Sequence, residues 1–274
     1  MKTIFNLSLR SYLIFLFCIW VSISTAQVKI TSWNIQNMGK SKTDESIAYM
    51  ANLLKDFDVI ALQEVVSGSG GAQSVARLAD ELNRKGAKWD YVISDPTQSS
   101  PYSSERYAFP WKSSKLQIIG KAWLENNYIN QIEREPFLIR LKYKQKTFTL
   151  VSFHAVPKNK QPETEIKYFK QFPTLYPNED LVFLGDFNVP STHTVFNPLK
   201  KMNYLSVLEG EKTTLKTKCK LKDCLASAYD HIFLNSTTIQ LLDCGLVYFH
   251  LDFLDMKASR RISDHIPIWV EIDF

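Results

Sequence analysis

Polar side chains that could do chemistry stand where apolar segments of this sequence end. The apolar run 181–184 stops at Gly185, and Asp186 and Asn188 follow, two positions apart. Side chains at positions i and i+2 of a strand point to the same side, so the acid and the amide would lie together. Such a pair must face water, a metal or a substrate. Taken alone, however, Asp186 could equally be a turn residue that caps the strand.

The same arrangement recurs along the chain. Five further polar side chains follow or interrupt apolar runs: Asn34, Glu64, His154, Asp264 and His265. Oxygen ligands with several positions left to water suit Mg²⁺ or Mn²⁺, whereas zinc requires a denser set of histidine or cysteine ligands. Acids, amides and two imidazoles at one edge could hydrolyse a phosphodiester. The metal would neutralise the phosphate, one base would activate water, and one acid would protonate the leaving oxygen.

These side chains can meet only if the strands that carry them end at a common rim. Apolar and alternating segments predict strands at 28–37, 59–65, 89–95, 106–111, 115–124, 136–144, 148–155, 181–188, 229–235, 241–249 and 262–274. Helical spacing is found at 46–56, 72–85 and 163–172. Many strands with few helices, and none between 106 and 154, favour two packed sheets with helices outside, an α/β sandwich.

The first 26 residues predict export. Lys2 and Arg10 precede an apolar run at 12–23, and Ala26 ends a small-residue cleavage site, as in a secretory signal peptide. The run is shorter than the roughly 18 residues that a membrane anchor needs. Residues 27–274 are then one domain, secreted or, in a bacterium, periplasmic. Without the two leader cations, the 33 basic residues fall to 31 against 28 acidic ones, a net charge of +3 that does not decide the partner.

Three cysteines remain in the exported chain. Oxidising conditions favour a disulfide, and Cys219 and Cys224 are natural partners because only four residues separate them. Cys244 lies inside an apolar run and is expected to be a buried free thiol. The lysine-rich segment 215–222 alternates with period two. It could be an edge strand protected by charge or a patch that follows a phosphate backbone. The remaining histidines of the exported chain are expected at the surface or in packing: His193, His231 and His250.

Five short motifs carry a family resemblance. QEV (63–65), SFHA (152–155), GDFN (185–188), YDHIF (229–233) and SDHIP (263–267) occur in this order and resemble the endonuclease/exonuclease/phosphatase superfamily. YVISDP…SERYAF (91–109) and EREPFLIRL (133–141) are similar to its deoxyribonuclease I-like branch. The motifs span nearly the whole exported chain. The resemblance implies a four-layer α/β sandwich, in which two packed mixed β-sheets are flanked by helices.

The resemblance also implies roles for single residues. The metal ligands, with the principal one first, would be Glu64, Asn34 and Asp264. His154 and His265 would be the acid–base pair around the scissile phosphate. Glu105 would orient the first imidazole and Asp230 the second, because a carboxylate fixes the tautomer and raises the imidazole pKa. The expected ion is Mg²⁺ or Mn²⁺, with Ca²⁺ as a candidate stabilising ion.

The substrate contacts follow in the same way. Asp186 and Asn188 would hold the metal-bound water and the phosphate, which answers why a buried strand ends in this pair. Arg134 would contact the DNA backbone, and Tyr107 would be a second substrate-binding residue. The branch often carries an arginine where this chain has Val66, so the hold on the minor groove is expected to be weaker.

Three functions are compatible with these residues. The first is a secreted, metal-dependent endonuclease, a monomer that cuts double-stranded DNA with little sequence preference. The second is a phosphatase or a sphingomyelinase-like phospholipase of the same superfamily. The third is a non-catalytic binding protein with this fold. Because the metal glutamate and both histidines are present, the third is disfavoured. The SERY and EREP motifs disfavour the second, and with no exposed apolar loop expected, stable membrane association is not predicted.

Overall fold

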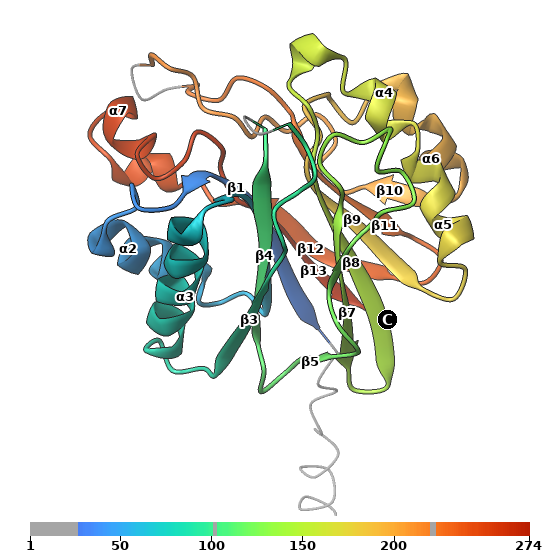
Figure 1. Ribbon diagram of the computed structural model, residues 1–274, viewed down its shortest axis with the longest axis horizontal. Coiled ribbons are helices and arrows are strands. Elements are labelled where there is room, and N and C mark those ends of the chain that lie inside the picture. The colour runs from blue at the N-terminus through green and yellow to red at the C-terminus, as the bar shows by residue number, and fades with distance from the viewer. Residues whose placement is uncertain (1–26, 101–102, 220–222) are drawn as a thin grey trace, which may run out of the picture.

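Two β-sheets pack face to face, and helices cover the outer face of each (Figure 1). The computed structural model describes residues 27–100, 103–219 and 223–274. The predicted signal peptide and part of the lysine-rich segment (220–222) lie outside the described residues. Within the described ranges, three hydrophobic clusters fill the interior, one between the sheets and one beneath each helical layer. The predicted four-layer α/β sandwich is therefore confirmed.

The first sheet contains the chain's N-terminal strands and its last one. In spatial order its strands are β12 (Gln240–Leu246), β13 (Ile268–Asp273), β1 (Val28–Met38), β2 (Val59–Val66), β4 (Glu105–Lys112) and β3 (Trp89–Ile93). Only β1 and β2 pair in parallel, and the other neighbours are antiparallel. The sheet is therefore mixed, and the polar ends of β1 and β2 lie at the same edge.

The second sheet is also mixed, because it contains one parallel pair of strands among antiparallel ones. Its order is β10 (Tyr204–Ser206), β11 (Asp230–Asn235), β9 (Asp180–Asp186), β8 (Lys146–His154), β7 (Phe137–Tyr143) and β5 (Gln117–Ile118), with β6 (Trp123–Leu124) paired to β7. Strands β8 and β9 are parallel, with His154 opposite Asp186. Strand β11 runs antiparallel to β9 and places Asp230 opposite the same aspartate. Three site residues are thus neighbours through strand register alone.

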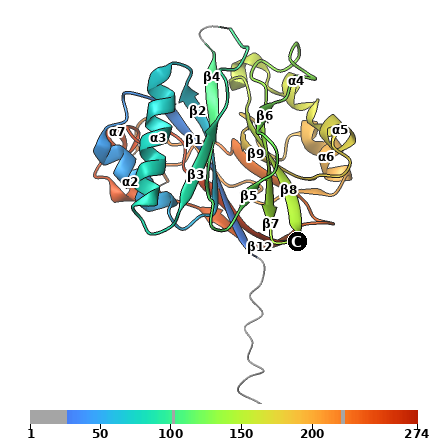
Figure 2. The same cartoon turned by 60° about the horizontal axis from the view of Figure 1, so that its bottom comes forward.

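Helices cover the two outer faces, as Figures 1 and 2 show. The first sheet is covered by α2 (Asp44–Leu54), α3 (Ser69–Asn83), η4 (Phe249–Asp252) and α7 (Met256–Ser259). The second sheet is covered by α4 (Glu163–Ile166), η2 (Phe169–Gln171), α5 (Phe172–Leu175), η3 (Thr194–Phe196) and α6 (Asn197–Lys201). A 3₁₀ turn, η1 (Lys158–Lys160), follows β8.

The apolar run in β9 reflects burial on both faces of the strand. Val182 and Leu184 point into the cluster between the sheets. Leu181 and Phe183 point the other way, into the cluster under the helices. Alternate side chains of a strand face opposite sides, so a strand in the middle of a four-layer fold must be apolar at every position. Polar residues are then confined to its end.

Some predicted elements differ in detail. The helix expected at 163–172 is broken into α4, η2 and α5, and Pro173 opens α5 because proline cannot donate within a continuing helix. The strand expected at 115–124 is split into β5 and β6 by Gly120, whose φ is +73°. In the described part of the lysine-rich segment there is no strand, only an isolated bridge from Leu215 to Leu225.

The cysteines pair as expected. Cys219 and Cys224 form a disulfide, and Cys244 is free but only partly buried. The surface also differs from the prediction, which was that no apolar loop is exposed. The segment around η4 exposes two leucines. Leu251 is 59% exposed and Leu254 is 95% exposed. No helix among the described residues is both long and apolar enough to cross a bilayer.

Candidate active site

The predicted site residues gather at one edge of the two sheets. Asp186 ends β9 and His154 ends β8, and the register between these parallel strands sets them side by side. Asn34 of β1 reaches across from the first sheet, and its Nδ2 donates to Asp186 Oδ2 at 3.1 Å and to Glu64 Oε1 at 3.0 Å. One amide thus connects the aspartate of the second sheet to the glutamate of the first.

The two histidines are arranged as a pair. His154 Nδ1 lies 2.9 Å from Glu105 Oε2, and His265 Nδ1 lies 2.7 Å from Asp230 Oδ2. The opposite nitrogens converge, since both Nε2 atoms face Asp186 Oδ2, at 3.5 and 3.6 Å. Each imidazole therefore has one nitrogen held by a carboxylate and the other directed at a common point. This geometry suits proton transfer to and from one substrate group.

The carboxylates control the charge of both imidazoles. Burial lowers the pKa of His154, but the carboxylates of Glu105 and Asp186 together more than offset this, and the net pKa is raised above its ordinary value. Burial likewise lowers the pKa of His265, while Asp230 and Asp186 together raise it to about 10. Each ring therefore holds its proton more readily than a free imidazole does and can donate it to a phosphate oxygen or to a leaving oxygen, while a ring that has given up its Nε2 proton can accept one from water.

Arg134 and Tyr107 lie behind His154. Arg134 is only 7% exposed, and its Nη1 donates to Glu105 Oε2 at 3.0 Å while its Nη2 donates to the Ala155 carbonyl. Burial raises the pKa of Glu105, but His154 and Arg134 together lower it below its usual value. Tyr107 is fully buried, and its hydroxyl accepts a hydrogen bond from the His154 backbone amide. Arg134 and Tyr107 were predicted to contact the substrate. In this structure both support His154 from the buried side.

Glu64 offers an open carboxylate for a metal. Its side chain is about a quarter exposed and borders a hollow of about 290 Å³. Its Oε2 accepts a hydrogen bond from the Asn37 backbone amide at 3.1 Å. Glu64, Asn37 and Asn188 all have positive φ, from 53° to 59°. Such backbone strain in non-glycine residues concentrates at functional sites. An accessible carboxylate at this position fits Mg²⁺ or Mn²⁺. The neighbouring Asn34 directs its Nδ2 at Glu64, and its Oδ1 accepts from the Gln36 amide at 3.2 Å.

A second group of ligand-type atoms is also present. One atom each from Asp186, Asp230 and His265 lie within 4.8 Å of one another. These atoms are already engaged, because Asp230 Oδ2 accepts from His265 and from Thr213 Oγ1 at 2.5 Å. The third predicted ligand, Asp264, is paired with Arg260 at 3.2 Å. The carboxylate of Glu64, about a quarter exposed, is therefore more accessible to a hard divalent ion than this group, in which Asp186 and Asp230 are buried.

Three supporting residues were missed by the sequence-based predictions. Thr213 holds Asp230 through its hydroxyl, and its carbonyl accepts from the Ile266 amide at 2.8 Å. Ser263 donates to the Asn34 carbonyl at 2.6 Å and accepts from the His265 amide at 3.0 Å. Lys42 binds backbone carbonyls just before Ser263. Only Ser263 lies inside a recognisable motif, SDHIP.

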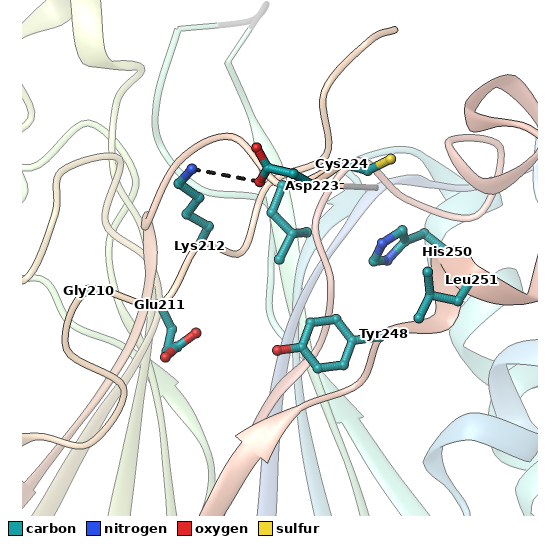
Figure 3. Close-up of a pocket in the computed structure, with 9 residues that line it drawn as sticks. Gly210, Glu211, Lys212, Asp223, Cys224, Tyr248, His250 and Leu251 are labelled. Atoms are coloured by element: carbon teal, nitrogen blue, oxygen red, sulfur yellow. Dashed lines mark ion pairs between the residues drawn. The ribbon is translucent and has the colours of Figure 1, made fainter. Parts of the chain in front are cut away.

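A second hollow is lined in part by the residues just before Thr213 in the chain (Figure 3). It has a volume of about 380 Å³ and is lined by residues that include Lys212, Asp223, Tyr248 and His250. Figure 3 shows the ion pair that joins Lys212 to Asp223 at 4.0 Å. Neither His154 nor His265 lines this hollow. His231 and His250 are buried, as packing histidines should be.

Comparison with known proteins identifies the family to which the chain belongs. Residues 31–265 match the Endonuclease/Exonuclease/phosphatase family, and the chain belongs to it. A protein named "Deoxyribonuclease" from Thioalkalivibrio sp. (strain K90mix) is 27% identical, over 95% of this chain and 75% of that protein. A "Deoxyribonuclease-1-like 1" from Chlorocebus aethiops is 28% identical, over 89% of this chain and 84% of that protein. The chain thus lies in the deoxyribonuclease I-like branch.

Solved structures share the fold at lower identity. A Danio rerio TDP2 structure, described as complexed with single-strand DNA product, gives a TM-score of 0.66 at 15% identity and covers 90% of this chain and 99% of that one. A family protein from Bacteroides thetaiotaomicron gives a TM-score of 0.63 at 16% identity, covering 90% of this chain and 98% of that one. These likenesses confirm the architecture.

Proposed function

We propose that this protein is an exported, metal-dependent endonuclease that hydrolyses phosphodiester bonds of double-stranded DNA with little sequence preference. One observation carries the proposal: two carboxylate-backed imidazoles direct their Nε2 atoms at the same oxygen of Asp186. A phosphodiester needs one group to take a proton from water and another to give a proton to the leaving oxygen. A binding protein would have no use for this paired arrangement.

The protein's own residues would divide this work. Because Glu105 and Asp230 hold the Nδ1 atoms, proton exchange with substrate would take place at Nε2 of each ring. Asp186 would orient the attacking water. Asn188 is held in place, since its Nδ2 donates to the Ala155 carbonyl at 3.1 Å and its amide donates to Asp186 Oδ1 at 3.0 Å.

A divalent ion completes the proposed site. It would be held by Glu64, Asn34 and Asp264, with Mg²⁺ or Mn²⁺ favoured by the oxygen ligands. When bound, such an ion neutralises charge on the scissile phosphate. Ca²⁺ is proposed only as an additional stabilising ion.

The choice of DNA rests on the relatives and on exposed cations. The curated relatives are named deoxyribonucleases. Lys158 and Lys160 are exposed on η1, which follows the His154 strand end. Lys212 and Lys218 are exposed on the segment that contains Thr213. Contacts from such side chains to phosphates position a protein without reading bases. Cleavage should therefore fall steeply between about 50 and 200 mM salt.

Export and a monomeric state are part of the same proposal. The disulfide between Cys219 and Cys224 is consistent with an oxidising compartment.

The exposed leucines Leu251 and Leu254 are the reason to test the lipid-directed alternative as well, because apolar side chains on a surface loop can enter a lipid interface.

The deciding experiment compares substrates under identical conditions. Purified protein is incubated with supercoiled plasmid in Mg²⁺ and in excess EDTA, beside sphingomyelin and inositol phosphates. We expect plasmid relaxation only with the metal, and no turnover of the lipid or sugar phosphate. Turnover of either of these with intact plasmid would replace the nuclease by a phospholipase or phosphatase. No turnover of any substrate would support a binding protein.

A further inference from the structure

Lys42 is a buried lysine at the edge of the site. It is only 3% exposed, and lysine is rarely buried to this degree unless its ammonium has partners. Its Nζ donates to the Ile262 carbonyl at 2.6 Å and to the Arg261 carbonyl at 3.2 Å. These partners lie about 220 positions further along the chain. Lys42 thus fastens the loop after β1 to the segment just before β13.

The Lys42 end of this connection is rigid. Its carbonyl accepts from Arg77 Nη1 of α3 at 3.1 Å. Its amide donates to the Gly39 carbonyl at 3.0 Å, and Ser74 of α3 donates to that same carbonyl at 2.9 Å. Two side chains of one long helix therefore hold the backbone that carries Lys42. The ammonium is presented from a fixed support rather than from a free loop.

The other end of the connection leads directly into the catalytic groups. The two carbonyls bound by Lys42 immediately precede Ser263, Asp264 and His265. The hydroxyl of Ser263 donates to the Asn34 carbonyl and accepts from the His265 amide. A shift of the backbone at 261–262 would therefore displace both the proposed metal ligand and the imidazole that follows it.

Lys42 also contributes charge. Burial lowers its pKa to about 8, and the carboxylates of Glu64 and Asp264 oppose this lowering. The hydrogen bond to the Ile262 carbonyl holds the ammonium two residues before Asp264 in the chain, and the ammonium is largely protonated at neutral pH. Glu64 and Asp264 are the two carboxylates proposed to hold the metal. A fixed cation beside them reduces their mutual repulsion and opposes the entry of a divalent ion.

We infer that Lys42 is a positioning residue and an internal counter-ion of the active site. Its hydrogen bonds hold the segment that carries Asp264 and His265, and its charge weakens divalent-ion binding at Glu64 and Asp264. The second part of the inference rests on the proposed function, because it assumes a metal at these carboxylates. The first part concerns the protein alone.

Three variants separate the two contributions. Lys42→Met removes both the charge and the hydrogen bonds, whereas Lys42→Gln removes the charge and keeps an amide that can donate to the carbonyls. Lys40→Met is the matched control, because it removes an exposed charge from the same loop. Mn²⁺ binding is measured by titration calorimetry, and backbone amide exchange in residues 263–266 is measured by mass spectrometry without metal.

The expected results differ for each variant. Both Lys42 variants should bind Mn²⁺ about three- to tenfold more tightly, because a buried like charge has been removed. Only Lys42→Met should exchange its 263–266 amides markedly faster and lose most of its turnover. Lys40→Met should match the wild type in all three measurements, since an exposed charge is screened by solvent and salt.

Clear outcomes would overturn the inference. Unchanged or weaker Mn²⁺ binding in both Lys42 variants would exclude the counter-ion role. Unchanged amide exchange in Lys42→Met would exclude the positioning role. If the wild type binds no Mn²⁺ at all, the proposed metal-dependent function fails instead, and the exchange experiment still tests the positioning role.

A measurement on the wild type covers the case in which neither variant folds. Nitrogen-15 spectra of lysine ammonium groups should show a slowly exchanging Lys42 signal, because its protons are buried and bound to carbonyls. That signal should shift when Mg²⁺ is added, as a cation enters near it. A signal that exchanges as fast as those of exposed lysines, or that ignores Mg²⁺, contradicts the inference.

Discussion

His154 and His265 come from opposite sheets yet direct their Nε2 atoms at one oxygen of Asp186, at 3.5 and 3.6 Å. His154 ends β8 in the second sheet, and His265 precedes β13 in the first. Each ring is held at Nδ1 by its own carboxylate. The pair therefore spans the interface between the sheets, and its geometry depends on how the two sheets pack.

Removing either imidazole should nearly abolish turnover. We expect His154→Ala and His265→Ala each to lower the rate of DNA cleavage by about 10²–10⁴. The double variant should lose less than the product of the two effects, because both groups serve one reaction. Plasmid relaxation measures the rates, and His193→Ala is the control because that ring instead caps a short helix. A single variant with near wild-type rate would remove its residue from the mechanism.

Replacing Glu64 by a neutral residue should abolish metal binding at the active site. In Glu64→Gln the open carboxylate is lost but the shape is kept, so we expect a large fall in cleavage rate. The increase in thermal stability on adding Mg²⁺, which follows from binding to the folded state, should also disappear. Glu45→Gln, an exposed change in α2, should keep both properties. Full cleavage by Glu64→Gln would show that the metal is held elsewhere.

Arg134 should act through Glu105 rather than through DNA. Because the two form a buried ion pair at 3.0 Å, Arg134→Met should lower the free energy of unfolding by about 3 kcal/mol. Denaturant unfolding measures this. The salt dependence of DNA binding should keep its slope, since no phosphate contact is lost. A slope reduced by about one unit with unchanged stability would instead indicate a direct backbone contact.

His231 should make the protein less stable in mild acid. Its ring is fully buried, and Nε2 donates to the Val189 carbonyl at 2.7 Å. Burial lowers its pKa from 6.5 to about 4. As pH falls through this window the unfolded chain takes up a proton that the folded chain refuses, so stability is lost.

The size of this effect follows from the same shift. Between pH 6.5 and 4 the loss from His231 should approach about 3 kcal/mol. His231→Gln keeps a donor for the carbonyl but cannot titrate, so its unfolding free energy should depend less steeply on pH over this window. Denaturant unfolding at several pH values measures both proteins. Parallel pH profiles would show that His231 is not the group responsible.

The sequence by itself determined the architecture and the chemical groups. Runs that are apolar at every position, as in β9, predict central strands of a layered fold, and polar residues directly after them mark the rim. The disulfide also followed from the sequence, because Cys219 and Cys224 are close along the chain. Local breaks were harder to predict, since Pro173 and Gly120 interrupt elements whose apolar pattern continues through them.

Only the tertiary structure decided how the groups are supported. Nothing in the sequence shows that Arg134 and Tyr107 are buried behind His154, because exposure depends on which segments pack over them. Thr213 and Lys42 were missed for a related reason. Each acts through partners far along the chain, and Lys42 binds backbone carbonyls. Carbonyls are present at every residue, so no pattern of side chains can indicate which of them a distant lysine will meet.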